Sequence, residues 1–178
     1  MIHLIGFAGR AGCGKSFAAK TLVRQAGFVL TRFADPLKDM LRCLGLGDAE
    51  VDGDLKETSS PLLCGKTPRW AMQSIGTEWG RTLIGPSLWT DAWARRADAV
   101  LARGGAVVVD DVRFQNEVDL VRARGGLVVW INRGAAVAVP AHVSEALQPE
   151  ACDMRVTNTG DDRFEAAIAG ALLEENAA

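Results

Sequence analysis

Eight consecutive residues near the beginning of the chain have the types and spacing of a phosphate-binding loop. They read Gly9-Arg10-Ala11-Gly12-Cys13-Gly14-Lys15-Ser16, a complete G-x-x-x-x-G-K-S motif. In such a loop the glycines let backbone N–H groups face phosphate oxygens, the lysine reaches the terminal phosphates, and the serine hydroxyl ligates magnesium. We therefore expect residues 9–16 to bind the triphosphate of a nucleotide, with Lys15 in a catalytic role and Mg²⁺ at Ser16.

A pair of carboxylates ends a second apolar segment. Val107-Val108-Val109 predicts a buried strand, and Asp110-Asp111 follow it directly. An acid at the end of a buried strand is typical of the second nucleotide-binding motif of phosphate-loop proteins, where it holds magnesium directly or through water. Adjacent side chains on a strand point to opposite faces, so one ion cannot take both. Asp110 is our candidate metal ligand, although the sequence alone does not decide between the two, and either could instead cap the next helix.

Three arginines are candidates for neutralising phosphate charge. Arg69 opens a helix after Thr67-Pro68, where the helix dipole disfavours a cation unless an anion lies nearby. Arg133 ends a strand and opens an excursion over residues 133–150, which we expect to act as a lid. Arg113 lies four residues before Glu117 on the next helix, so the two form either a surface pair or part of a substrate pocket. A solvated surface role is the alternative for Arg69 and for Arg133.

The elements that must position these residues alternate along the chain. Short β-branched or apolar runs predict five strands, at residues 2–8, 28–33, 106–111, 127–131 and 154–158. Segments with helical spacing separate them, including 17–22 after the phosphate loop, 36–42, and a stripe of Met72, Ile75, Trp79 and Leu83. Gly76 and Gly80 interrupt that stripe and indicate a break or a close approach by another group. Residues 45–67 show no sustained period and are expected to form a mobile surface loop.

This alternation predicts an α/β fold with three layers, in which a mainly parallel, doubly wound sheet has helices on both faces. Ligands of such sheets bind beyond the carboxyl ends of the strands, and every candidate motif lies at such an end. The 178 residues are sufficient for one domain, 1–178, with its own core.

Composition excludes several classes of function. The net charge is −2, so no general basic field favours nucleic acid. No apolar run is long enough to span a membrane, and the N-terminal apolar run reads as a strand and not as a signal peptide. Four scattered cysteines and two histidines disfavour a structural zinc site, and their usage fits reduced thiols in a cytoplasm. We expect a cytoplasmic protein without nucleic-acid or membrane partners; a homodimer stays open.

Five tryptophans occur in a chain without tyrosine, and most of them must belong to the core. Trp89 lies in the first turn of a helix that Ser87 can cap, near the expected cleft. Because stacking on an aromatic ring tolerates any base, Trp89 is our candidate surface for a nucleobase.

Five segments, taken in order, resemble the bacteriophage deoxynucleoside monophosphate kinases, a branch of the P-loop nucleoside monophosphate kinases. They cover nearly the whole chain: residues 9–16; Phe33-Ala34-Asp35-Pro36-Leu37-Lys38-Asp39; Arg69 through Gln73-Ser74-Ile75-Gly76-Thr77-Glu78; Asp111-Val112-Arg113 with Asn116-Glu117; and His142-Val143-Ser144-Glu145 with Val156-Thr157-Asn158-Thr159-Gly160. The blocks Gln-x-x-Gly-Thr and Asp-x-Arg are the more selective ones.

The resemblance implies ATP-dependent phosphorylation of a deoxynucleoside monophosphate to the diphosphate, in the host cytoplasm if a phage encodes the chain. It implies that the monophosphate is held by Lys38, Arg69, Gly76, Thr77, Trp89, Asp111, Arg113 and Glu117. It also implies that Asn158 and Gly160 approach the adenine of ATP. Transfer then requires two anions held in line with their charge neutralised by Lys15, Mg²⁺ and Arg69, Arg113 and Arg133.

Two other functions stay open at this point. One is a P-loop kinase of another small phosphate acceptor, such as dephospho-coenzyme A. The other is an ATP-binding or ATPase module that engages a macromolecular partner. The Gln-x-x-Gly-Thr block and Trp89 favour a nucleotide acceptor over the first, and the balanced charge disfavours DNA as the partner of the second.

Overall fold

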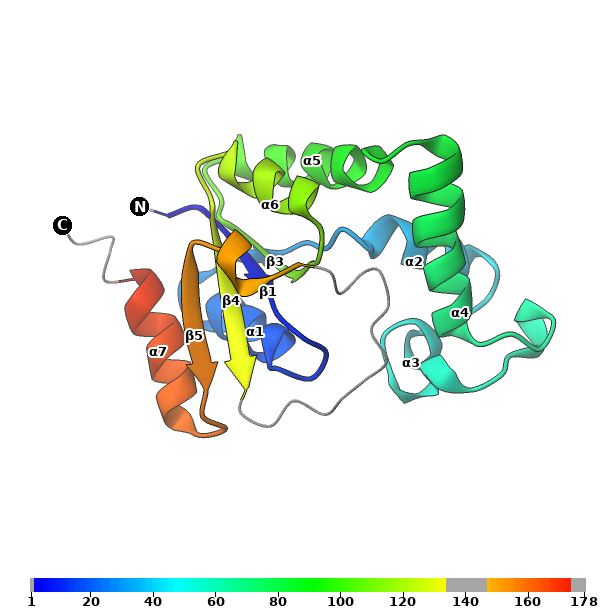
Figure 1. Cartoon of the computed structure of the whole chain (residues 1–178), viewed down its shortest axis with the longest axis horizontal. Coiled ribbons are helices and arrows are strands. Elements are labelled where there is room, and N and C mark those ends of the chain that lie inside the picture. The colour runs from blue at the N-terminus through cyan, green and yellow to red at the C-terminus, as the bar shows by residue number, and fades with distance from the viewer. Residues whose placement is uncertain (1, 134–146, 174–178) are drawn as a thin grey trace. The chain divides into compact units, whose positions relative to one another are not determined.

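The computed structural model describes residues 2–133 and 147–173 (Figure 1). The chain divides into two compact units, each of which is treated by itself. The sheet unit comprises Met1–Arg32 and Ala94–Ala178, and the helical unit comprises Phe33–Trp93. The expectation of one domain over 1–178 stays a prediction.

The sheet unit is built on five parallel strands in the order β2-β3-β1-β4-β5. Their bounds are β1 Leu4–Ala8, β2 Val29–Leu30, β3 Val107–Val112, β4 Leu127–Arg133 and β5 Met154–Asn158. β1 lies in the middle, is buried throughout, and pairs with both β3 and β4. Because all strands run the same way, the phosphate loop after β1 shares its edge of the sheet with the ends of β3, β4 and β5.

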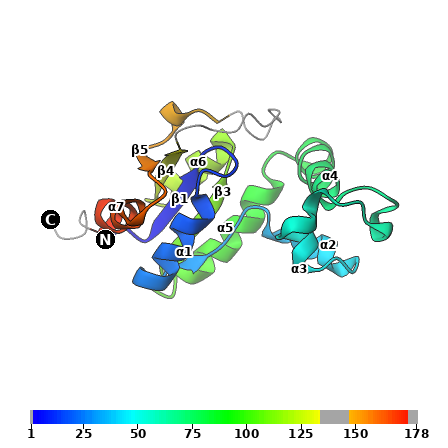
Figure 2. The same cartoon turned by 90° about the horizontal axis from the view of Figure 1, so that it is seen from below.

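Helices cover both faces of this sheet, as the sequence predicts. α1 (Lys15–Ala26) and α7 (Asp162–Leu173) pack on one face, and α6 (Gln115–Arg122) contacts β1 and β4 from the other (Figure 2). The core between the strands and helices α1 and α7 contains Ile5, Phe7, Ala18, Ala19, Leu22, Val108, Val129, Ile131, Phe164 and Ile168. α5 (Leu88–Leu101) begins in the helical unit and ends in the sheet unit.

The second strand is shorter than its pattern indicates. Residues 28–33 predict a strand, but β2 comprises only Val29–Leu30, and Thr31 adds one further backbone hydrogen bond to Val108. β2 is the edge strand and pairs with β3 alone, so a single neighbour stabilises it. The chain then enters the helical unit at Phe33.

The helical unit has its own small core. Its first helix is α2 (Asp35–Cys43), which begins around Pro36 as expected, since proline lacks an N–H that the first turn does not need. Leu41, Leu46, Val51 and Ala71 form the buried centre. Residues 45–67, expected to be irregular, contain α3 (Asp48–Val51) and two 3₁₀ helices, Asp54–Glu57 and Pro61–Leu63. Helices of three or four residues are too short to show a hydrophobic period, so the pattern missed them.

The segment interrupted by glycines is helical throughout but changes type. α4 (Pro68–Gln73) continues into a π-helix, Ser74–Ile84. The close approach expected at Gly80 is present, because a Cβ on this residue would lie 2.5 Å from the indole ring of Trp89. π-Helix is rare and occurs mostly as single turns inside α-helices, which are frequent at functional sites.

Over the described residues, none of the helices combines the length and the apolar character that crossing a bilayer would require.

Candidate active site

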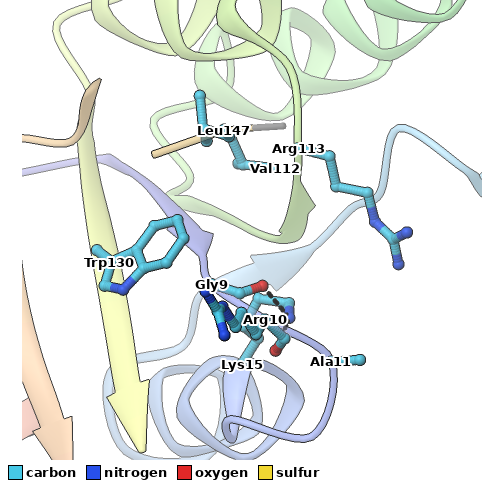
Figure 3. A pocket seen from close by; sticks show the side chains of 8 residues that line it. All are labelled: Gly9, Arg10, Ala11, Lys15, Val112, Arg113, Trp130 and Leu147. Atoms are coloured by element: carbon cyan, nitrogen blue, oxygen red, sulfur yellow. Dashed lines mark hydrogen bonds between the residues drawn. The ribbon is translucent and has the colours of Figure 1, made fainter. Parts of the chain in front are cut away.

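The phosphate loop wraps around its own lysine. Lys15 is the first residue of α1, and its Nζ donates hydrogen bonds to the carbonyl oxygens of Gly9 at 2.7 Å and Arg10 at 2.9 Å (Figure 3). Gly14, the preceding N-cap residue, has φ +109°, a conformation that favours glycine. The ammonium group therefore lies against the backbone of its own loop, held by two carbonyl acceptors.

A pocket of about 330 Å³, including space open to solvent, adjoins this loop in the sheet unit. Arg113, after β3, and Trp130, on β4, lie on opposite sides of it in Figure 3. The full lining is Gly9, Arg10, Ala11, Lys15, Val112, Arg113, Trp130 and Leu147. The sequence analysis proposed the loop residues, Lys15 and Arg113, and it missed the three apolar ones. In the sequence, Trp130 appeared only as part of an expected strand, and Val112 only as the middle residue of the Asp-x-Arg block.

Burial lowers the pKa of Lys15 below its ordinary value, since the charged ammonium loses water. The neighbouring Cys13 sulfur, 3.8 Å from Nζ, and the Asp110 carboxylate oppose this shift in pKa, whereas the Arg113 guanidinium adds to it. Lys15, Asp110 and Arg113 are therefore close enough to interact electrostatically. Lys15 and Arg113 also line the same pocket, which lies between the loop and the end of β3.

Asp110 is buried and already has a cationic partner. Its side chain is 3% exposed, and its Oδ1 accepts a hydrogen bond from Nε of Arg32 at 2.8 Å. Arg32 follows the edge strand β2, which neighbours β3, so the pair joins two adjacent strand ends. The sequence analysis did not single out Arg32. Its position after an expected strand, at the edge where ligands bind, is the signal that could have identified it.

The oxygen atoms at this edge suit magnesium. Mg²⁺ prefers carboxylate, hydroxyl and phosphate oxygens, and in kinases it takes one or two protein ligands besides the substrate phosphates. Ser16 is exposed in the first turn of α1, and Asp110 and Asp111 lie near the end of β3. No cluster of three metal-binding side chains occurs within residues 2–133 and 147–173, and this chemistry does not require one.

Glu117 closes the beginning of α6. Its Oε2 accepts hydrogen bonds from the backbone N–H groups of Arg113 at 2.7 Å and Phe114 at 3.1 Å. Phe114 is the N-cap residue, so this is one half of a capping box. Only 2% of Glu117 is exposed. The geometry therefore supports a role in holding the backbone of Arg113, and it gives no support to direct contact with substrate, which stays a prediction.

Arg133 and Asn158 lie against the phosphate loop from the ends of β4 and β5. Nη1 of Arg133 donates to the carbonyl of Gly12 at 3.2 Å, and Nδ2 of Asn158 donates to the carbonyl of Cys13 at 2.8 Å. The backbone N–H of Gly160 donates to Oδ1 of Asn158. Both side chains thus contact the backbone of the loop. The expected roles, charge neutralisation by Arg133 and an approach of Asn158 to the adenine, stay predictions.

Two predicted substrate residues are paired with acids inside the helical unit. Nζ of Lys38 donates to Oδ1 of Asp52 at 2.7 Å. Nε of Arg69 donates to Glu57 on the neighbouring 3₁₀ helix. An anion near Arg69 was expected because of its place at a helix start, and Glu57 provides one within the chain. Binding of a monophosphate by either cation stays a prediction.

Trp89 is a core residue of the helical unit. It is 4% exposed, and its indole Nε1 donates to the carbonyl of Gly76 at 2.7 Å. Its ring centroid lies 6.2 Å from that of Trp79, which is 40% exposed. This environment gives no support to stacking of a base on Trp89; it shows the indole fixing the backbone next to Thr77, another predicted substrate residue.

Part of the expected site lies outside the described residues. Residues 134–146 of the lid-like excursion belong there, and so does the segment His142–Glu145 that contributes to the family resemblance.

Comparison with known proteins agrees with the resemblance. Residues 66–166 match the sequence profile of the family described as deoxynucleotide monophosphate kinase. A protein of Acanthamoeba polyphaga mimivirus with the provisional name deoxynucleotide monophosphate kinase is 35% identical over 154 residues, which cover 80% of each chain. Dephospho-CoA kinase from Campylobacter jejuni has a similar structure, with a TM-score of 0.54, 12% identity and 98% of each chain covered. At that identity the similarity shows the fold alone, and it confirms the fold predicted from the sequence.

Proposed function

Because the chain belongs to the deoxynucleotide monophosphate kinase family, we propose that it transfers the γ-phosphoryl group of ATP to a deoxynucleoside monophosphate. The bond between the β,γ-bridging oxygen and the γ-phosphorus breaks, and a bond from an oxygen of the acceptor phosphate to that phosphorus forms. The products are ADP and a deoxynucleoside diphosphate. That the chain is a nucleotide kinase follows from the family; ATP as donor and the deoxynucleotide as acceptor are the proposal.

One observation carries this proposal for the sheet unit. Lys15 and Arg113 line the same pocket, and Asp110 is near enough to influence the pKa of Lys15. A phosphate-binding loop with a lysine and a second cation beside it suits a transition state whose charge spreads over the γ-phosphoryl oxygens. Transfer of this kind requires positioning and charge neutralisation, so no general base is assigned.

The remaining roles follow from the resemblance. Residues 9–16 hold the triphosphate, Asp111 and Arg113 take part in holding the acceptor nucleotide, and Arg133 adds positive charge beside the loop. Lys38, Arg69, Gly76 and Thr77 of the helical unit keep their predicted part in acceptor binding. Magnesium, bound by the Ser16 hydroxyl and an aspartate that ends β3, would neutralise charge on the donor phosphates. A cytoplasmic location and the absence of nucleic-acid partners stay predictions.

A panel of acceptors with ATP, measured by ADP formation, tests the proposal. The panel contains deoxynucleoside and ribonucleoside monophosphates and dephospho-coenzyme A. We expect saturable ADP formation with at least one deoxynucleoside monophosphate and conversion of that acceptor to its diphosphate. Lys15→Ala is the control, because it removes the cation of the loop and should abolish turnover without changing the circular dichroism spectrum. ADP formation that is independent of any acceptor, or specific to dephospho-coenzyme A, would contradict the proposal.

A further inference from the structure

We propose that Asn158 is a positioning residue that holds the phosphate-binding loop in its ligand-ready conformation. The family resemblance instead places Asn158 near the adenine of ATP. The inference rests on the proposed ATP site, and it deepens it by assigning the side chain to the loop backbone.

Two hydrogen bonds fix the orientation of the Asn158 amide. Its Nδ2 donates to the carbonyl of Cys13 at 2.8 Å, and its Oδ1 accepts from the backbone N–H of Gly160 at 2.8 Å. Because one end of the amide can only donate and the other can only accept, both bonds form with one orientation of the group. The turn after β5 therefore holds the amide so that its donor faces the loop.

The loop backbone is packed directly against this amide. A Cβ on Gly14, the N-cap residue of α1, would overlap with Nδ2 of Asn158. The contact therefore leaves no room for any side chain at Gly14, beyond the requirement of its positive φ. Such a close approach makes the position of the loop depend on the side chain at 158.

A neighbouring residue holds the loop in the same way. Arg133 is the register partner of Asn158 in the pairing of β4 with β5, and its Nη1 donates to the carbonyl of Gly12 at 3.2 Å. Two paired strand-end residues thus bind two consecutive carbonyls of the loop, those of Gly12 and Cys13. Because Arg133 carries a charge that would attract phosphate by itself, Asn158 offers the cleaner test of positioning.

Holding a carbonyl also orients the next amide. The peptide unit between Cys13 and Gly14 is planar and trans, so its N–H points away from the side on which its C=O lies. When Asn158 fixes the Cys13 carbonyl, the Gly14 N–H is directed away from β5. Backbone N–H groups of this loop are the ones that bind phosphate oxygens. Asn158 thereby acts on the phosphates through the backbone and not on the base.

Inorganic tripolyphosphate separates the two roles because it has no base. We would measure its affinity and that of ATP by calorimetry for the unaltered chain, for Asn158→Ala, and for Asn132→Ala as control. Asn132 is an exposed asparagine on β4 next to Arg133, so the same substitution there leaves the amide at 158 in place. We expect Asn158→Ala to weaken both ligands by a similar factor, about fivefold, as the loss of one uncharged hydrogen bond predicts. The ratio of ATP to GTP affinity should not change, and the control should bind both ligands normally.

Two other results overturn the inference, and a third overturns the proposed ATP site on which it rests. Weaker ATP binding with unchanged tripolyphosphate binding would show contact with the base. Unchanged affinities with a lower melting temperature would show a purely structural role. Failure of the unaltered chain to bind either ligand would instead remove the proposed ATP site itself. If the alanine variant does not fold, Asn158→Ser replaces it, since a serine can still accept from the Gly160 N–H but is too short to reach Cys13.

Discussion

Removal of the Glu117 carboxylate should destabilise the sheet unit more than it affects substrate binding. The buried carboxylate accepts two backbone hydrogen bonds at the start of α6, from Arg113 and Phe114. A capping interaction contributes about 0.5–2 kcal/mol, and a buried donor left unsatisfied costs about 1–3 kcal/mol. Both hydrogen bonds are only partly buried, so a freed N–H can regain some water, and we assign one full penalty for the two donors in addition to the lost cap. The sum for Glu117→Ala is about 3 kcal/mol.

The conservative variant, Glu117→Gln, should lose less stability than Glu117→Ala. Glu117→Gln keeps a carbonyl oxygen as acceptor but loses the charge that strengthens both bonds, for a cost of about 1 kcal/mol. The control is Asp119→Ala on the same helix, where an exposed carboxylate accepts from Gln115 at 2.8 Å. A pair of this kind contributes a few tenths of a kcal/mol. The loss of stability should therefore be largest for Glu117→Ala, smaller for Glu117→Gln and smallest for Asp119→Ala.

Urea unfolding followed by circular dichroism measures these differences, and thermal unfolding provides a second reading. For a chain of this size 1 kcal/mol corresponds to roughly 2–4 °C, so Glu117→Ala should lower the melting temperature by about 6–12 °C. The KM of the acceptor should rise only slightly, because Glu117 affects the acceptor only by holding the backbone of Arg113. If both Glu117 variants are as stable as the unaltered chain while the acceptor KM rises, Glu117 binds substrate directly and the capping argument is refuted.

Three further perturbations probe other parts of the structure. Gly80→Ala should destabilise the helical unit by about 2 kcal/mol, because the new methyl group would lie 2.5 Å from the Trp89 indole. Urea unfolding measures this change, and an unchanged stability would mean that the π-helix adapts to the methyl group. Arg69→Ala should raise the KM of the acceptor without changing the KM of ATP, whereas an unchanged acceptor KM would leave Arg69 as the partner of Glu57 only. Affinity for ATP should fall as the pH rises through the lowered pKa of Lys15, because the neutral amine no longer attracts phosphate. The loss should begin below pH 10.5, the ordinary pKa of a lysine. Calorimetry across this range measures the affinity, and a constant affinity up to pH 10.5 would contradict the prediction. The same lowered pKa means that charging Lys15 opposes folding, so this group's contribution to stability should rise with pH between its folded and unfolded values.

Much of the site could be located from the sequence because its parts are local. The phosphate loop needs glycines, a lysine and a serine at fixed spacing, and the strand before it and the helix after it have periods that can be read directly. The strand at Met154–Asn158 agrees with its predicted bounds, and β3 carries Asp110 and Asp111 near its end. In a parallel sheet all strand ends of one sense meet at one edge, so these positions alone predicted that the loop, the aspartates and Asn158 come together.

The partners of these residues could not be predicted in the same way. Arg32 and Asp110 are 78 residues apart, and Asn158 and Cys13 are 145 residues apart. Nothing in either local pattern indicates which distant atom a side chain will reach. Trp89 is an example: its aromatic character suggested a surface for a base, but its indole is buried against Gly80 and bonded to Gly76.

The sequence by itself predicted a phosphate-binding loop, the edge of the sheet at which it lies, and the lysine that would serve it. These follow from short-range rules of backbone conformation and period, which act within a few residues. Only the tertiary structure decided that Lys15 rests on its own loop carbonyls, that Glu117 caps a helix, and that Asn158 holds the loop from β5. Those roles depend on hydrogen bonds whose geometry is set when strands and helices pack, because a polar group in a core takes whichever partner the packing places within reach.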